Sequence, residues 1–217
     1  PGYVWRVARV FAKNSAGERG DLGAVVRAIL LDYEARTPAL ACNGGYGKLK
    51  EPLLRVTALL RAFSASANNG RYYIPNPEGP PAEAALRSPT VFNFFEPDYV
   101  LPGTLAAAGL YAPEYQIFTD TTAITVPNEL QRYIYTAAQP PDTALTLELD
   151  PLLPLARTPG PLLDYLNLVF CGGSMPADTR ERIAQALAAL PPNTGDLDRV
   201  RSALQLTVTS TAAAIQR

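Results

Sequence analysis

Apolar residues recur at the three-to-four-residue spacing of an α-helix along most of this chain. Asp21 suits the N-cap of one such stripe, Pro52 the first turn of the next, and Ser174 the cap of a later one. The clearest stripes predict helices over 21–35, 52–66, 176–189 and 197–214. Weaker stripes predict helices over 3–12, 119–138 and 160–170. We therefore predict an all-α fold, an irregular helical domain that spans 1–217 with little or no sheet.

The segment from about 70 to 118 lacks this periodicity and is rich in proline and large aromatic residues. Its aromatic content argues against disorder, so we predict a long, ordered, irregular insertion. Short helices are expected around Leu86 and over 105–108. The aromatic residues most expected in the core are Phe92, Phe94 and Phe95. Residues 145–149 alternate as a strand would, but the sequence offers no partner strand, so we expect extended coil there.

The composition excludes several classes of function. The 19 Lys and Arg residues nearly balance the 20 Asp and Glu residues, which excludes a generally basic nucleic-acid binder. The chain has no histidine, so it cannot by itself build a Ser-His-Asp or Cys-His site, or a metal site that needs imidazole. No apolar run reaches the roughly 18 residues of a membrane-spanning helix. We expect no metal, no cofactor, no nucleic-acid partner and no membrane span.

The chain has two cysteines, Cys42 and Cys171, which lie far apart in the sequence. In an exported protein the pair could form a disulfide. Both could equally be small buried apolar side chains. The residues alone leave the two interpretations open.

Three carboxylates among the aromatic residues are the strongest catalytic candidates, namely Glu96, Asp98 and Glu114. Paired carboxylates can hydrolyse glycosidic bonds without histidine, provided that they lie within roughly 5–10 Å of each other in a cleft. The alternative is a structural role in which they cap helices and accept hydrogen bonds from loop amides.

Tyrosines of the same segment are the candidate binding residues. A tyrosine combines a large apolar ring with a polar hydroxyl, which suits both a partly buried position and a contact surface. The predicted binding surface consists of Tyr72, Tyr73, Tyr99, Tyr111 and Tyr115.

Several runs together resemble a known family. They are GKLKEPLLR at 47–55, SPTVFNFFEPDY at 88–99 followed by Pro102 and Gly103, APEYQI at 112–117 followed by Asn128, and RVRSAL at 199–204 continuing to 217. In order and spacing the chain resembles the C-terminal part of the large bacterial family called domain of unknown function 1800. The resemblance extends over essentially the whole chain.

The resemblance implies a C-terminal part of a longer protein, whose helical N-terminal part is then an expected partner. The abrupt start of the chain, inside a helical pattern and without methionine, fits the same expectation. Members often carry export signals, which implies a periplasmic or secreted bacterial protein and is compatible with a Cys42–Cys171 disulfide. The family has no established reaction, so the resemblance implies no catalytic residues.

Two functions therefore remain in view. The first is an exported, non-catalytic binding or assembly module for a partner protein or an envelope polymer. The alternative is a carboxylate-dependent hydrolase that acts on a polysaccharide or an ester, with a site that the N-terminal part could complete.

Overall fold

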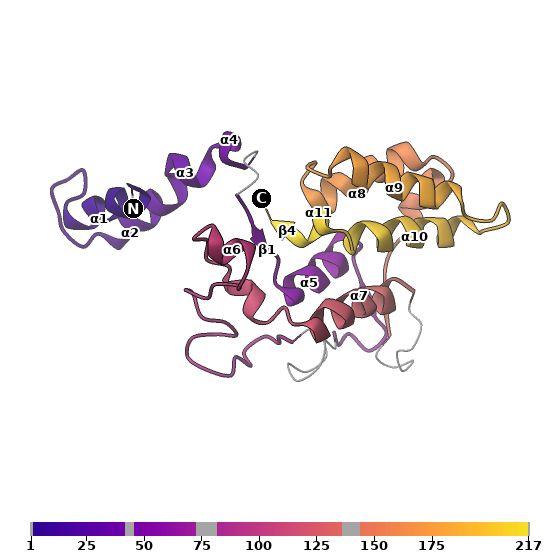
Figure 1. Ribbon diagram of the computed structural model, residues 1–217, viewed down its shortest axis with the longest axis horizontal. Coiled ribbons are helices and arrows are strands. Elements are labelled where there is room, and N and C mark those ends of the chain that lie inside the picture. Colours follow the sequence, from indigo (N-terminus) through magenta and orange to yellow (C-terminus); the bar gives the residue numbers. More distant parts are fainter. Residues whose placement is uncertain (1, 42–45, 73–81, 136–143, 217) are drawn as a thin grey trace. The chain divides into compact units, whose positions relative to one another are not determined.

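The computed structural model describes residues 2–41, 46–72, 82–135 and 144–216, and it is predominantly helical, which confirms the predicted class (Figure 1). The helices are α1 Gly2–Ala12, α2 Leu22–Leu31, α3 Tyr33–Arg36, α4 Pro38–Ala41, α5 Pro52–Ala62, α6 Thr104–Ala107, α7 Asp120–Tyr135, α8 Pro159–Cys171, α9 Ala177–Ala188, α10 Asp196–Val208 and α11 Thr211–Ala214. Two 3₁₀ helices are η1 Pro113–Gln116 and η2 Asp150–Leu155. The strands are β1 Lys48–Leu49, β2 Ser66–Ala67, β3 Leu145–Thr146 and β4 Ile215–Gln216.

The contacts within the chain divide it into two compact units, 1–47 and 48–216, and the single domain over 1–217 stays a prediction. Unit 1 is built on a hairpin of α1 and α2. Asp21 caps α2 as expected, because its carboxylate accepts a hydrogen bond from the Ala24 amide at 3.0 Å. The predicted helix 21–35 is interrupted at Asp32, whose extended backbone ends α2 and whose side chain caps α3.

Unit 2 has its core around α10, which packs against α7, α8, α9 and η2. Val200, Ala203 and Leu204 of α10 have no exposed surface, and neither do Leu59 of α5 and Leu130 of α7. These residues recur at helical spacing, so each helix contributes one apolar face to a shared interior. Among the described residues, no helix is both long and apolar enough to cross a membrane.

Two small antiparallel sheets join distant segments of unit 2. Strand β1 pairs with β4, so Lys48 and Leu49 lie beside the last described residues of the chain. Strand β2 pairs with β3, which corrects the expectation of extended coil at 145–149. The partner strand, Ser66–Ala67, is too short to show the alternation that identifies a strand in a sequence.

Other differences between the predicted and the observed helices also have local causes. The predicted helix 197–214 ends at Val208, because the Ser210 hydroxyl starts a new helix by accepting from the Ala213 amide. Ser174 is not a cap, since its hydroxyl donates to the Cys171 carbonyl and α9 begins three residues later. No helix forms around Leu86, which has a φ of 61°, a value that a helix does not allow. The short helix near 105–108 is present as α6.

Candidate functional site

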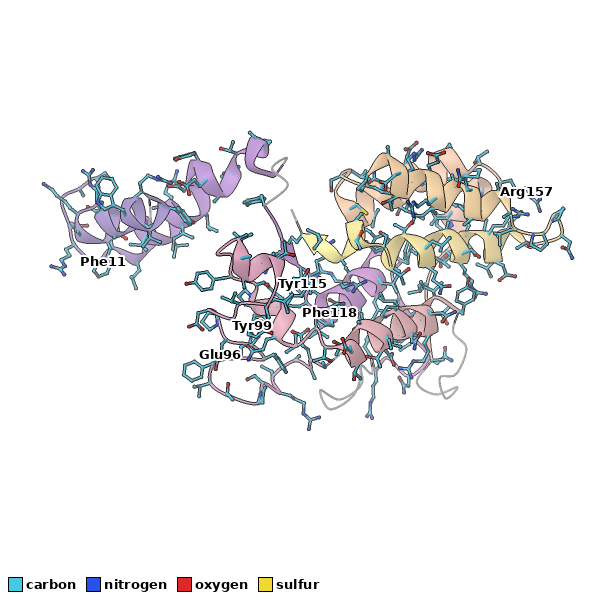
Figure 2. All side chains as sticks on the ribbon, viewed as in Figure 1. Phe11, Glu96, Tyr99, Tyr115, Phe118 and Arg157 are labelled. Carbon is cyan, nitrogen blue, oxygen red and sulfur yellow. The ribbon has the colours of Figure 1, made fainter. Side chains whose placement is uncertain are left out.

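Two hydrogen bonds of backbone amides connect distant parts of the aromatic segment within its described residues, 82–118. The Ala112 amide donates to the Tyr99 carbonyl at 2.9 Å, and the Glu96 amide donates to the Gln116 side chain at 2.7 Å. Figure 2 shows Glu96, Tyr99, Tyr115 and Phe118 in this part of unit 2. The two runs that carry the family resemblance, 88–99 and 112–117, are thus brought together.

The candidate tyrosines do not share one environment. Tyr72 and Tyr111 are exposed, whereas Tyr99 and Tyr115 are half-buried. The Tyr115 ring packs edge-on against Phe118, with ring centroids 6.2 Å apart. Tyr73 lies outside the described residues. The expectation that Phe92 fills the core is wrong, because its side chain is exposed, while Phe94 and Phe95 are half-buried.

Tyr72 lines an apolar pocket of about 320 Å³. Its hydroxyl donates to the Ala65 carbonyl at 2.7 Å, which fixes the ring beside the C-terminal end of α5. The other residues of this pocket are Thr57, Leu60, Arg61, Ser64 and Ala65.

The candidate carboxylates also differ in their exposure to solvent. Glu96 and Asp98 are exposed to solvent, whereas Glu114 is buried in η1. The nearest cation to Glu114 is Lys48, whose ammonium nitrogen lies 3.7 Å from the carboxylate. Glu114 therefore pairs with a residue of β1, and both its predicted catalytic role and the hydrolase stay predictions.

The run GKLKEPLLR places two cations at the carboxyl ends of two helices. The Lys50 ammonium donates to the Phe170 carbonyl, near the end of α8, at 2.8 Å. The Arg55 guanidinium donates to the Val208 carbonyl, the last residue of α10, at 3.0 Å. Cations are favourable there, because the terminal carbonyls lack helical partners and carry the negative end of the helix dipole. The run GKLKEPLLR therefore connects to the carboxyl ends of two helices in the core of unit 2.

Cys171 is buried at the end of α8, and it has no disulfide partner within the part of the chain that the structure describes. Burial raises the pKa of this thiol, although nearby Lys50 acts in the opposite direction. A thiol of this kind is a poor nucleophile. Cys42 lies outside the described residues, so the predicted disulfide stays a prediction.

A carboxyl group that the sequence analysis did not select is the most perturbed. Glu83 is 1% exposed, and burial raises its pKa to about 7. One of its oxygens accepts from the Leu53 amide in the first turn of α5 at 3.0 Å, and the other has no hydrogen-bond partner among the described residues. Glu83 therefore caps α5, although it lies 30 residues away in the sequence. No local pattern around residue 83 could have indicated this role.

The α1–α2 hairpin exposes an unusually large number of apolar side chains. No residue of α1 or α2 is buried, although both helices are rich in large apolar side chains. The contact between the helices is made by half-buried side chains such as Tyr3, Val7 and Val25. A second apolar stripe stays exposed, and we call it the apolar flank: Val4, Ala8, Phe11, Leu22, Val26 and Ile29.

The flank residues of both helices lie on one side of the hairpin. Each follows a contact residue by one position, as Val4 follows Tyr3 and Val26 follows Val25. The helices are antiparallel, since Gly2 at the start of α1 lies near Glu34, beyond the end of α2. In an antiparallel pair a step of one residue turns both helices toward the same side. The two stripes therefore form one continuous surface.

Comparison with known proteins agrees with the runs that resemble a family. The family described as protein of unknown function (DUF1800) matches residues 1–214. Neither the curated proteins nor the solved structures include a match to this chain. Because the match extends over nearly every residue, the chain belongs to the DUF1800 family of proteins of unknown function.

Proposed function

We propose that this protein is a non-catalytic assembly module and that it assembles through the apolar flank of its α1–α2 hairpin. The observation that carries the proposal is the exposure of the flank: Val4, Leu22 and Val26 are 69%, 66% and 53% exposed. A contiguous apolar surface of this kind is characteristic of a protein interface. The predicted tyrosine surface receives less support, because Tyr99 and Tyr115 are half-buried.

The occupant we assign to the flank is the same surface of a second copy of the chain. Two hairpins that pack flank to flank about a twofold axis form a four-helix bundle, in which each stripe covers its counterpart. Arg19 is the charge associated with the flank, since its guanidinium lies 5.9 Å from the centre of the Phe11 ring. Arg9 and Arg27 precede contact residues by one position and so project from the opposite side. Pairing therefore buries apolar surface without bringing these cations together.

The experiment compares two valine-to-lysine variants by sedimentation over a range of concentrations. Val26→Lys places a charge in the flank, whereas the control Val91→Lys places it on an irregular loop where the valine is 94% exposed. We expect wild type and Val91→Lys to dimerise, and Val26→Lys to dimerise at least about tenfold more weakly, since an unpaired buried charge is costly.

Circular dichroism checks that both variants keep their helices. Wild type that is monomeric at every concentration contradicts the proposal, as does equal dimerisation of the two variants. A monomeric wild type would leave a different protein, or other residues of this chain, as the occupant of the flank.

Export from a bacterial cell, to the periplasm or the medium, is part of the proposal and rests on the family. In an oxidising compartment we expect Cys42 and Cys171 to be joined, so the intact mass of native protein should rise by one pair of hydrogen atoms on reduction. Mass spectrometry with and without reductant measures this. Two thiols that are alkylated without prior reduction would remove both the disulfide and the support it gives to export.

A further inference from the structure

The side of α1 that carries Arg9 contains a cleft of about 360 Å³ in unit 1. It is lined by Trp5, Arg6, Arg9, Val10, Lys13 and Asn14, which all belong to α1 or to the turn that follows. We propose that this cleft binds an acidic sugar, such as a uronic-acid unit of a polysaccharide. This site is separate from the apolar flank and does not depend on assembly through it.

Two of the polar residues in the cleft are already engaged. Arg6 donates two hydrogen bonds of 2.7 Å to Asp32 and one of 2.7 Å to Glu34. The Asn14 amide nitrogen donates to Asp21 at 2.8 Å, and its oxygen accepts from two backbone amides. These hydrogen bonds fix the side chains of Arg6 and Asn14, which form part of the wall of the cleft.

Arg9 and Lys13 have no ion-pair partner within the part of the chain that the structure describes. Arg9 lies in the last turn of α1, and Lys13 follows the helix directly, with its amide still bonded to the Arg9 carbonyl at 2.9 Å. The two residues are four apart, so they lie one above the other about 6 Å apart along the direction of the helix. Both side chains line the cleft. Such a pair favours an anion that spans both groups or sits between them.

Trp5 adds a surface for stacking. The Arg9 guanidinium carbon lies 4.8 Å from the centre of its ring, yet the indole is 58% exposed. Ring surface therefore remains for the flat apolar face of a sugar ring. The guanidinium that stacks on the indole also borders this surface, so a ligand stacked there places its carboxylate within reach of Arg9.

Among the described residues, three side-chain groups of the cleft have no hydrogen-bond or ion-pair partner, and all are donors: the guanidinium of Arg9, the ammonium of Lys13 and the indole N–H of Trp5. A ligand rich in acceptors satisfies them, and an acidic sugar offers a carboxylate, ring oxygens and hydroxyls. A peptide backbone carries a donor for nearly every acceptor, so its N–H groups would stay unpaired here. A nucleic acid would gain little, because its affinity grows with the number of phosphates neutralised and this cleft supplies two cations.

The test uses the fluorescence of Trp5, which is the single tryptophan of the chain. A short galacturonate oligomer is titrated into the chain of residues 1–217, with the neutral galactose oligomer as the matched sugar. We expect a saturable change in emission with the acidic oligomer and none with the neutral one. Arg9→Gln and Lys13→Gln should each weaken binding by about tenfold, the usual effect of losing one charge-assisted hydrogen bond.

The control Arg27→Gln removes another cation of the hairpin that does not line the cleft and should leave binding unchanged. Val26→Lys should also bind normally, so a failure of assembly and a failure of this site are distinguishable. The proposal is overturned if the emission does not change, if the neutral oligomer binds equally well, or if Arg27→Gln weakens binding as much as Arg9→Gln. Tighter binding of single-stranded DNA or of an acidic peptide would also overturn it.

Discussion

Replacing Arg55 by alanine should lower the free energy of unfolding by roughly 2–4 kcal/mol. Arg55 is 8% exposed and donates to the carbonyl that ends α10, the central helix of unit 2. The variant leaves this buried carbonyl without its donor and removes a packed aliphatic stem. Burial also lowers the pKa of Arg55, which indicates that its charge is held at a cost in the folded protein.

Two variants separate these contributions to the loss. Arg55→Met keeps much of the stem and abolishes the buried charge, so it should lose less than Arg55→Ala. The matched control Arg61→Ala, an exposed position on the same helix, should change stability by less than about 0.5 kcal/mol. Denaturant unfolding followed by circular dichroism measures all three. Equal, small effects of Arg55→Ala and Arg61→Ala would show that Arg55 does not anchor α10.

Glu83→Gln should stabilise the protein at about pH 8 and leave its stability nearly unchanged at about pH 4. The pKa of Glu83 is raised from 4.5 to about 7 by burial, with a smaller contribution from Glu51. A carboxyl group whose pKa is higher in the folded than in the unfolded state stabilises the fold below pH 4.5. That contribution is lost as the pH rises toward about 7.

The expected loss is on the order of 2–3 kcal/mol between these two pH values. Glutamine stays neutral and can still accept the hydrogen bond from the Leu53 amide, so the variant should lack this loss. The difference between wild type and variant isolates Glu83 from other carboxylates. Asp32 and Glu34 have lowered pKa values, because Arg6 binds them, and they act in the opposite direction. A constant difference in stability from pH 4 to pH 8 would contradict the role of Glu83.

Helical periodicity predicted most of the fold, because the longer helices of unit 2, namely α5, α7, α8, α9 and α10, each have one apolar face toward a common interior. Helix interruptions were harder to predict. The apolar stripe over 197–214 continues past Val208, but the Thr209 and Ser210 hydroxyls bond to the carbonyls of Gln205 and Thr207. Local hydrogen bonds of this kind end a helix without any change in hydrophobic pattern.

No local sequence pattern could have predicted the roles of the cations in the run GKLKEPLLR. Pro52 signals the start of α5, but Lys50 and Arg55 bind carbonyls 120 and 153 residues away. Partners at such a separation depend on how the helices pack. Glu83 is a similar case, since its cap on α5 bridges 30 residues.

The apolar flank is another case in which a sequence pattern does not identify the contact partner. The stripes of α1 and α2 were visible in the sequence and predicted two helices, which the structure contains. A stripe identifies side chains that favour burial, but it does not say what covers them. In this hairpin the stripes are wider than the contact between the helices, so half of each remains exposed.

The most direct test of assembly through the flank is amide hydrogen exchange of the wild-type chain at low and high protein concentration. Added protection should appear in α1 and α2 as the concentration rises, and the loop 82–95 should exchange equally at both. Protection that depends on concentration but lies in unit 2 would contradict the proposed interface. So would a hairpin that is equally protected at every concentration, because residues of the same chain would then already cover the flank.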